Sequence, residues 1–262
     1  MSQNVMWSPI GGVYPSILAI GDSWFWYPLP GGSLINHLGS LVESREHVVL
    51  ALGYNGAESV DYTVGKYRKT IRTALKHHGK SLSAVFISGG GNDFAGFNDL
   101  RPMLAADCSA AKSASACFRD GDSNGTLGWT MHRLAESYRI LIEQVVDYCT
   151  PRTKVILHTY DYALPSGIGL FGDESKLLLP ALIDANVPVA LRAACVKHVI
   201  DRLTEELNEL RSFDTKRIVL VDSRGCLDAD EWANEIHPKP AGFKRIAEER
   251  WHPVLRDLGL AK

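Results

Sequence analysis

A serine follows the first strongly apolar run of the chain. Residues 17–20 are Ile-Leu-Ala-Ile, and Gly21, Asp22 and Ser23 come directly after them. An apolar run without alternation is typical of a buried parallel strand, and open parallel sheets bind ligands beyond the carboxyl ends of their strands. A serine hydroxyl is a weak nucleophile unless a base lies within hydrogen-bond reach. The sequence therefore predicts Ser23 as a nucleophile that needs a histidine and an oxyanion hole from elsewhere in the chain.

His237 is the histidine best placed to act as that base. It lies in the segment Trp-Ala-Asn-Glu-Ile-His-Pro-Lys-Pro at 232–240, between the last predicted strand and the last predicted helix. The prolines on its C-terminal side fix the local backbone and limit where the imidazole can point. Other histidines suit structural roles, since His77 and His78 close a predicted helix and His158 lies inside a predicted strand. We predict that His237 serves as general base.

Two glycine-rich turns offer donors for an oxyanion. Residues 89–93 are Gly-Gly-Gly-Asn-Asp after the third predicted strand, and Gly56 ends the turn Gly-Tyr-Asn-Gly at 53–56 after the second. A phosphate cradle is an alternative for 89–93, but no Lys-Ser or Lys-Thr follows it. The side-chain amide of Asn92 and the backbone N–H of Gly56 are the donors that a developing oxyanion needs, and losing one such donor raises a barrier by about 3 kcal/mol.

Taken together, these segments resemble the four sequence blocks of the GDSL/SGNH hydrolase superfamily. The blocks occur in the family's order across nearly the whole chain, as Gly21-Asp22-Ser23, Gly56, Gly90-Gly91-Asn92-Asp93 and His237. The resemblance implies a flavodoxin-like fold and ester hydrolysis without a cofactor. It also implies that Ser23 is the nucleophile, that His237 is the general base, and that Ser23 N–H, Gly56 N–H and the Asn92 amide form the oxyanion hole. Ordinary α/β-hydrolases match less well, because their nucleophile lies in Gly-x-Ser-x-Gly.

The chain departs from the family pattern at the residue expected to orient His237. The family usually has an aspartate three positions before the histidine, where this chain has Asn234. An amide can hold an imidazole in place, but it cannot stabilise an imidazolium by charge. We favour Asn234 as the orienting residue, and four nearby acids remain alternatives: Asp228, Asp230, Glu231 and Glu235.

The wider pattern of the chain predicts an α/β fold. Apolar runs rich in Val, Ile, Leu and Ala alternate with helical periodicity, which is typical of a doubly wound sheet with right-handed crossovers. The predicted strands cover 16–20, 47–52, 84–88, 154–159 and 217–221, and the predicted helices cover 33–43, 58–78, 127–149, 189–211 and 241–258. We expect a single domain over 1–262, built as a three-layer α/β/α sandwich around a five-stranded, mainly parallel sheet.

Two long segments interrupt the alternation, at 94–125 and 161–188. Loops of this length in a compact domain are usually functional or disordered, and both follow strand ends on the same edge of the sheet as Ser23. Surface decoration is the alternative to a lid. The apolar residues of the second segment favour a lid with an acyl-binding wall at Leu170 and Phe171. Trp24, Phe25 and Trp26 are candidates for the opposite wall.

Composition restricts the class of partner. The 262 residues carry a formal net charge of −2, without a run of like charges that would indicate a nucleic-acid or membrane surface. No signal-peptide pattern is evident, and no apolar run approaches the roughly 18 residues that a membrane span requires, so we expect a cytoplasmic protein. The 5 cysteines are scattered, which favours reduced thiols, with a Cys108–Cys117 pair as the alternative. No motif indicates a metal site, and no cofactor is expected.

The leading functional hypothesis is a serine hydrolase that cleaves carboxylic esters through an acyl-Ser23 intermediate. A small-molecule or lipid-like ester is the expected partner. Two alternatives stay open: a carbohydrate O-deacetylase that uses the same site, and a non-catalytic ligand-binding member of the fold, which Asn234 makes plausible. The sequence indicates neither the acyl chain length nor the oligomeric state.

Overall fold

The computed structural model describes residues 4–7, 14–27, 32–170 and 177–262. A six-stranded sheet forms the centre of the fold, with strand order β1-β3-β2-β4-β5-β6 and every neighbouring pair parallel. Without β1, this is the flavodoxin order, whose ligand crevice opens between the first and third strands; here these are β2 and β4. The strands are β1 Val5–Met6, β2 Ile17–Gly21, β3 Val49–Gly53, β4 Ala84–Ser88, β5 Lys154–His158 and β6 Ile218–Val221.

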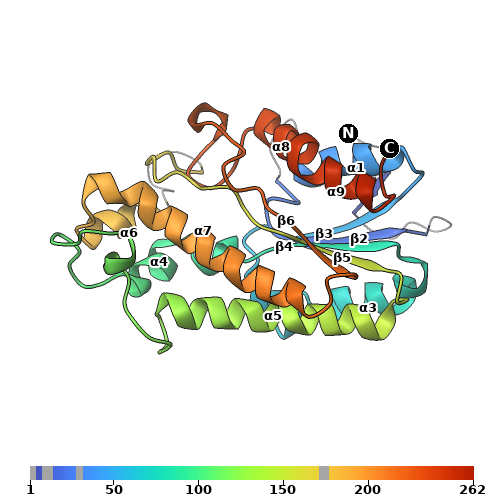
Figure 1. Ribbon diagram of the computed structural model, residues 1–262, viewed down its shortest axis with the longest axis horizontal. Helices are drawn as coiled ribbons and strands as arrows, with labels where there is room; N and C mark the ends of the chain where they lie inside the picture. Colours follow the sequence, from blue (N-terminus) through green and yellow to red (C-terminus); the bar gives the residue numbers. More distant parts are fainter. Residues whose placement is uncertain (1–3, 8–13, 28–31, 171–176) are drawn as a thin grey trace.

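Helices cover both faces of the sheet. Figure 1 shows α1, α8 and α9 over one face and α3, α5 and α7 over the other, so the molecule has three layers. The helices are α1 Leu34–Glu43, α2 Ser59–Thr63, α3 Arg68–His78, α4 Phe97–Met103, α5 Leu127–Tyr148, α6 Leu179–Asp184, α7 Val189–Ser212, α8 Pro240–Ile246 and α9 His252–Asp257. The predicted α/β class and layering are therefore confirmed.

The positions of the buried residues explain how the layers join. Every residue of β2 and of β4 is buried, as expected for strands covered on both faces. Thr126 is the N-cap of helix α5, and its side chain accepts a hydrogen bond from the backbone N–H of Trp129. Its buried residues recur every three or four positions and include Leu134, Tyr138 and Leu141. This apolar stripe holds the helix against the sheet.

The predicted strand number was wrong by one. Strand β1 adds a sixth strand at the edge of the sheet, where Val5 pairs with Val49 and Met6 with Leu50. The five predicted strands all occur, within two residues of their expected bounds. Because β1 is only two residues long, it has no alternation or apolar run that a sequence pattern could register.

Two predicted helices are interrupted. The segment 58–78 forms α2 and α3 with a turn between them, because Gly65 lies so close to the preceding turn that a Cβ would come within 2.7 Å of the Cα of Asp61. The segment 241–258 forms α8, a π-helical turn at Ala247–Trp251 and α9, which has Pro253 in its first turn. Proline fits a first helical turn because the N–H groups there have no intrahelical acceptor.

The two insertions contain short helices that pack together. Helix α4 lies in the first insertion and α6 in the second, and Figure 1 shows both at the same end of the molecule. The backbone N–H of Cys108 donates to the carbonyl of Ala185, which links the two segments at 2.8 Å. All 5 cysteines are buried free thiols, so the structure has no Cys108–Cys117 disulfide. Within the described ranges, no helix is both long enough and apolar enough to cross a membrane.

Candidate active site

A tight turn after β2 presents Ser23. The carbonyl of Asp22 accepts hydrogen bonds from the backbone N–H groups of Phe25 and Trp26, at 3.1 and 3.0 Å. A Cβ at Gly21 would lie 2.6 Å from the carbonyl oxygen of Ser88, so only glycine allows β2 and β4 to approach this closely here. The turn places the hydroxyl of Ser23 at the carboxyl end of β2, where the flavodoxin order opens its crevice.

A second tight loop brings His237 to Ser23. The backbone N–H of Ala233 donates to the carbonyl of His237 at 2.8 Å, and Trp232 pairs with Pro238 as an isolated antiparallel bridge. The indole N–H of Trp24 donates to the carbonyl of Ile236 at 2.9 Å, which ties this loop to the turn after β2. As a result, His237 Nε2 lies 2.7 Å from Ser23 Oγ.

Asn234 holds the other side of the imidazole. Its Oδ1 lies 3.2 Å from His237 Nδ1 and accepts the backbone N–H groups of Ile236 and His237, at 3.1 and 2.9 Å. Its Nδ2 donates to the hydroxyl of Tyr27 at 3.0 Å. Because backbone N–H groups can only donate, these contacts assign the amide oxygen to the side that faces the ring. This arrangement favours the tautomer with hydrogen on Nδ1 and a lone pair on Nε2 toward Ser23.

Tyr27 belongs to this group of residues, although the sequence analysis did not identify it. Its ring stacks on the imidazole of His237, with centroids 4.2 Å apart and planes inclined by 22°. Burial raises the pKa of its phenol, so the hydroxyl stays protonated at neutral pH. In the sequence, Tyr27 is one member of an aromatic run after Ser23, and no local signal separates it from Phe25 and Trp26.

The alternative acids are engaged elsewhere. Asp228 and Glu231 both accept hydrogen bonds from Arg245, and Asp230 is exposed. Glu235 is buried, and its carboxylate accepts four backbone N–H groups, those of Gly167, Leu177, Leu178 and Leu179. In the part of the chain that the structure describes, Asn234 is therefore the side chain that contacts His237 Nδ1.

Burial keeps the imidazole neutral. His237 is 3% exposed, and the loss of hydration lowers its pKa to about 3, because a buried imidazolium has no water to stabilise it. The neighbouring Asp22 shows the opposite effect, since burial raises the pKa of its carboxyl to about 6, although hydrogen bonds from Tyr160 and Trp24 partly offset that effect. At neutral pH, His237 is thus able to accept a proton from Ser23.

Three hydrogen-bond donors predicted for an oxyanion hole belong to residues that line one cleft. The backbone N–H groups of Ser23 and Gly56 find no acceptor among the described residues. The amide of Asn92 donates one hydrogen to the carbonyl of Ala57 at 2.9 Å, which leaves its second hydrogen free. Gly56 has a φ of 68°, in the left-handed region that favours glycine. Asn92, Gly56 and Ser23 line a common cleft.

Comparison with solved structures identifies the fold. A lipase from a goat rumen metagenome matches with a TM-score of 0.56 and 13% identity, over 95% of this chain and 99% of that one. An extracellular lipase from Streptomyces rimosus matches with a TM-score of 0.55 and 15% identity, over 93% and 99%. A protein assigned as a GDSL-like lipase from Parabacteroides merdae matches with a TM-score of 0.53 and 15% identity, over 96% and 100%. The chain has the fold of these three proteins. No protein-family model matches the sequence, and no curated protein is similar to it.

In this fold, a cleft of about 470 Å³ opens over Ser23 and His237. Both insertions contribute to it, the first through Ala95, Gly96 and Asp99 and the second through Leu170 and Leu177. Its acidic residues are Glu58 and Asp99, and among the described residues neither Lys nor Arg lines it. The cleft is therefore suited to neutral ligands rather than anionic ones.

Only some of the residues predicted to bind substrate line a cavity beside Ser23. Leu170 lines the cleft, and Trp24 lines a smaller cavity behind Ser23. Phe25 is fully buried with its ring against Trp251, so the structure does not place it at the cleft. Trp26 packs edge-on against Trp7 and lines neither cavity at Ser23. Phe171 lies outside the described residues.

Metal ligands do not gather in the part of the chain that the structure describes. No group of three or more His, Cys, Asp or Glu residues within the described ranges has the arrangement needed to hold a metal ion. The buried His158 is instead hydrogen-bonded to two hydroxyls, those of Ser88 and Ser223, at 2.9 and 2.8 Å. Its position between serines in the core indicates a structural role.

Proposed function

We propose that this chain is a serine hydrolase that cleaves carboxylic esters through an acyl-Ser23 intermediate. The single observation that carries the proposal is the continuous series of contacts from Ser23 Oγ to His237 Nε2 at 2.7 Å and from His237 Nδ1 to Asn234 Oδ1 at 3.2 Å. Nucleophile, base and orienting group are the three parts that an activated serine requires. Lipases of the same fold support the choice of an ester.

Acylation begins when His237 Nε2 accepts the proton of the Ser23 hydroxyl. Ser23 Oγ attacks the ester carbonyl carbon, and the carbonyl oxygen becomes an oxyanion that accepts hydrogen bonds from Ser23 N–H, Gly56 N–H and Asn92 Nδ2. The bond to the alcohol oxygen then breaks, and the imidazolium returns its proton to that oxygen. An alcohol leaves, and the acyl group stays on Ser23.

Deacylation repeats these steps with water. His237 Nε2 accepts a proton from a water molecule, and the resulting hydroxide equivalent attacks the acyl carbon in the same oxyanion hole. The bond to Ser23 Oγ breaks, and the proton passes from His237 to the serine. The carboxylic acid leaves, and both side chains recover their starting states. Asn234 keeps the ring orientation through both steps.

The first test of this proposal is the hydrolysis of p-nitrophenyl acetate. Ser23→Ala and His237→Ala should each lower kcat by at least about 10³-fold, and the double variant should be little worse, because residues that act as a unit are not additive. Ser40→Ala, which changes an exposed serine on α1, is the matched control and should keep full activity. If Ser23→Ala kept more than a few per cent of the activity, Ser23 would not be the nucleophile.

A further inference from the structure

A second, smaller cavity lies behind Ser23. It is apolar for most of its surface, and its walls come from the turn after β2, the start of the first insertion, the segment after β5, helix α7 and the loop before His237. The side chains that shape it are Trp24, Phe94, Ala95, Tyr160, Ala163 and Ile200. All six are nine-tenths or more buried.

The positions of Ser23 and His237 determine which part of an ester this cavity can hold. Four residues line both the cavity and the large cleft, namely Ser23, Asn92, Ala95 and Ile236, whereas His237 and Gly56 line only the cleft. The leaving oxygen must face His237 to receive its proton, so the alcohol part of the ester belongs in the cleft. The acyl part then belongs in the small cavity, which His237 does not line.

The cavity suits an uncharged group, although two aspartates border it. Asp22 accepts hydrogen bonds from the hydroxyl of Tyr160 and the backbone N–H of Trp24, at 2.6 and 2.9 Å. Asp161 accepts the backbone N–H groups of Tyr162, Gly225 and Leu227. Because both carboxyls already have donors, what remains toward the cavity is mainly apolar surface.

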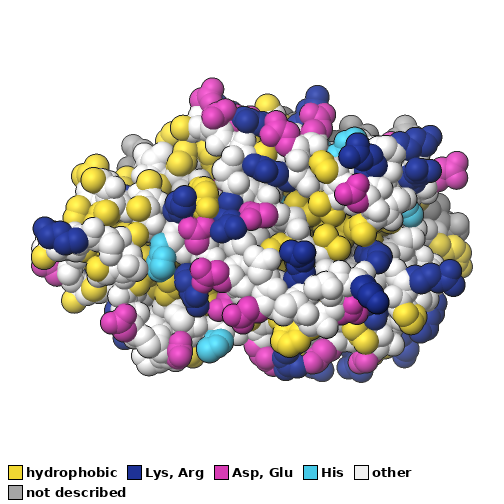
Figure 2. Space-filling model, in the orientation of Figure 1, with side chains coloured by type: hydrophobic (Ala, Val, Ile, Leu, Met, Phe, Trp, Pro, Cys, Tyr) yellow, Lys and Arg dark blue, Asp and Glu magenta, His cyan; other side chains and the backbone are white. Residues whose placement is uncertain are grey.

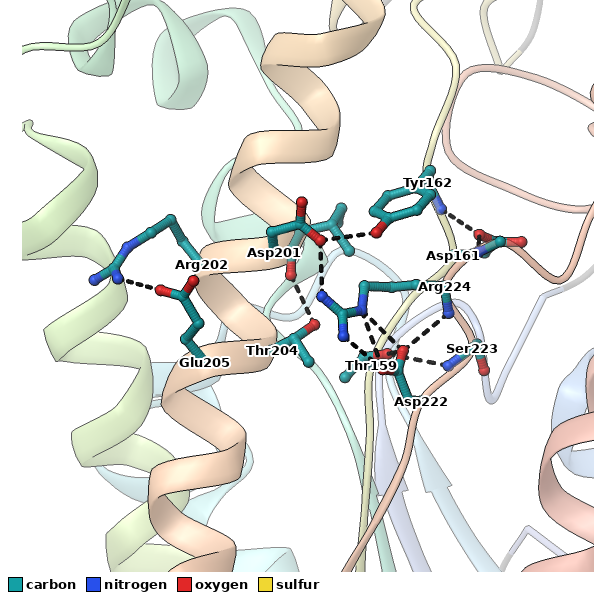
Figure 3. A network of polar contacts seen from close by, with 12 residues as sticks. Thr159, Asp161, Tyr162, Asp201, Arg202, Thr204, Glu205, Asp222, Ser223 and Arg224 are labelled. Atoms are coloured by element: carbon teal, nitrogen blue, oxygen red, sulfur yellow. Dashed lines mark hydrogen bonds and ion pairs between the residues drawn. The ribbon is translucent and has the colours of Figure 1, made fainter. Parts of the chain in front are cut away.

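A polar network fixes the outer wall of the cavity. Figure 3 shows Arg224 between Asp222 and Asp201, and its guanidinium lies 2.6 and 2.7 Å from their carboxylates. The hydroxyl of Tyr162 donates to the same Asp201 at 2.8 Å. Asp201 follows Ile200 on α7, and Tyr162 precedes Ala163, so the network joins two of the segments that form the wall. The wall is therefore tied in place and cannot easily move outward for a longer chain.

The size of the cavity limits the acyl group. Its volume is about 30 Å³, against about 470 Å³ for the cleft. The cavity therefore has room only for a small group. We propose that this cavity is the acyl pocket and that it admits an acetyl or propionyl group, while the cleft takes a larger alcohol. This inference rests on the proposed function, and it differs from the sequence-based expectation that Leu170 lies on the acyl wall.

The direct test is a series of p-nitrophenyl esters that share one leaving group. We expect kcat/KM to be highest for acetate and propionate, to fall at least about tenfold at butyrate because each poorly accommodated methylene costs about this much, and to fall further at octanoate. Equal or higher kcat/KM for octanoate than for acetate would overturn the proposal. This measurement uses the wild-type chain, so it does not depend on whether a variant folds.

Paired variants localise the effect. Phe94→Ala enlarges the cavity and should raise the butyrate-to-acetate ratio of kcat/KM at least about tenfold. Leu170→Ala makes a similar deletion on the cleft side of Ser23 and should leave that ratio unchanged. Ala163→Leu fills the cavity and should lower kcat/KM for acetate by about tenfold or more, because cores tolerate added volume poorly. Equal ratios for Phe94→Ala and Leu170→Ala would contradict the assignment.

Labelling of Ser23 by a fluorophosphonate separates this inference from the proposed function. If Ser23 is labelled but the acyl series has no preference for short chains, the acyl pocket is wrong and the hydrolase proposal stands. If folded protein neither reacts with the probe nor cleaves any ester of the series, the proposed function fails and the acyl pocket fails with it. Thermal unfolding of each variant checks that the cavity substitutions leave the fold intact.

Discussion

His237 is a buried imidazole that is held by an amide rather than by a carboxylate. In chymotrypsin-type triads, replacing the acid by its amide lowers turnover about 10⁴-fold because the wrong tautomer is held. Here the backbone N–H groups of Ile236 and His237 fix the amide of Asn234 with its oxygen toward the ring. This orientation favours the tautomer with hydrogen on Nδ1. The imidazolium that would form when Nε2 accepts a proton gains no compensating charge from the amide.

The substitution Asn234→Asp supplies that charge in the same geometry. The hydroxyl of Tyr27 can donate to the new carboxylate as readily as it now accepts from the amide. A carboxylate at this distance should raise the pKa of His237 by about one to three pH units from its present value near 3. Since the base must be neutral, the acid limb of kcat/KM should move to higher pH, and kcat above it should hold or rise.

The pH profile of kcat/KM, which reports the pKa values of the free enzyme, checks this result. Glu231→Gln, which changes an acid bound to Arg245 rather than to His237, is the matched control and should leave the profile unchanged. A profile for Asn234→Asp identical to that of wild type, together with a kcat more than about tenfold lower, would contradict the orienting role of Asn234.

Tyr27 acts through Asn234 and His237 as a positioning residue. Tyr27→Phe keeps the stacked ring but leaves the amide N–H of Asn234 without its acceptor, and should lower kcat about tenfold. Tyr27→Ala also removes the ring and should cost more. Tyr54→Phe is the matched control, since its ring stacks on Tyr67 instead. A kcat for Tyr27→Phe equal to that of wild type would show that the hydroxyl has no part in positioning the base.

Some residues of the site can be predicted from their neighbours in the sequence, whereas others depend on contacts with residues far away in the chain. Ser23 and Asn92 each lie in a short motif next to a strand end, and His237 lies in a short motif before α8, so their neighbours in the sequence indicate them. The role of Tyr27 depends on Asn234, which lies 207 residues away in the chain. No window of sequence contains both, and the apolar cavity is likewise assembled from five separate segments.

At the level of elements, Glu235 joins the second insertion to the loop that carries His237. Its carboxylate accepts backbone N–H groups from both ends of the segment 167–179. The backbone N–H of Glu235 donates in turn to the carbonyl of Ile168 at 3.1 Å. The base of this predicted lid is therefore tied to the candidate active site by a single residue.

Glu235→Gln should loosen this connection. The amide NH₂ would face backbone donors and would lose two hydrogen bonds to a charged group, so we expect a loss of about 3 kcal/mol in the free energy of unfolding and a higher KM. Glu248→Gln removes an exposed i,i+4 pair with Lys244 and should cost about 0.5 kcal/mol or less. Urea unfolding and limited proteolysis within 161–188 measure both effects, and equal stability of the two variants would contradict the anchoring role.

The elements that could be predicted are those with a long local pattern. The runs at 17–20 and 84–88 are apolar throughout, so their burial on both faces follows from composition. The break at Gly65 and the helices α4 and α6 were not predicted. A single glycine is compatible with a helix, and α4 and α6 are stabilised by packing on one another rather than by long amphipathic periods.

For the whole molecule, buried titratable groups make stability depend on pH in opposite directions. Burial raises the pKa of Asp22 from its ordinary 3.8 to about 6, so its contribution to stability is complete at low pH and is lost as pH rises through 6. Burial lowers the pKa of His158 from its ordinary 6.5 to about 3, so its contribution is complete above 6.5 and is lost as pH falls toward 3. The two effects oppose each other between these limits.

Two substitutions should therefore change the pH dependence of the free energy of unfolding in opposite directions. Between about pH 4 and 6, Asp22→Asn should make the slope of unfolding free energy against pH more positive by up to about 1.4 kcal/mol per pH unit, and His158→Gln should make it more negative by a similar amount. Urea unfolding at several pH values measures the slopes, and each variant serves as the control for the other. Curves parallel to wild type in both would contradict the assigned protonation states.

The central claim is that His237 activates Ser23 as a nucleophile, and the rate of covalent labelling tests it most directly. A fluorophosphonate should add once to the wild-type chain, peptide mass spectrometry should locate the adduct on Ser23, and Ser23→Ala should remove it. His237→Ala should slow labelling by at least about 100-fold while the protein stays folded. Labelling of another residue, or a rate for His237→Ala equal to that of wild type, would contradict the account.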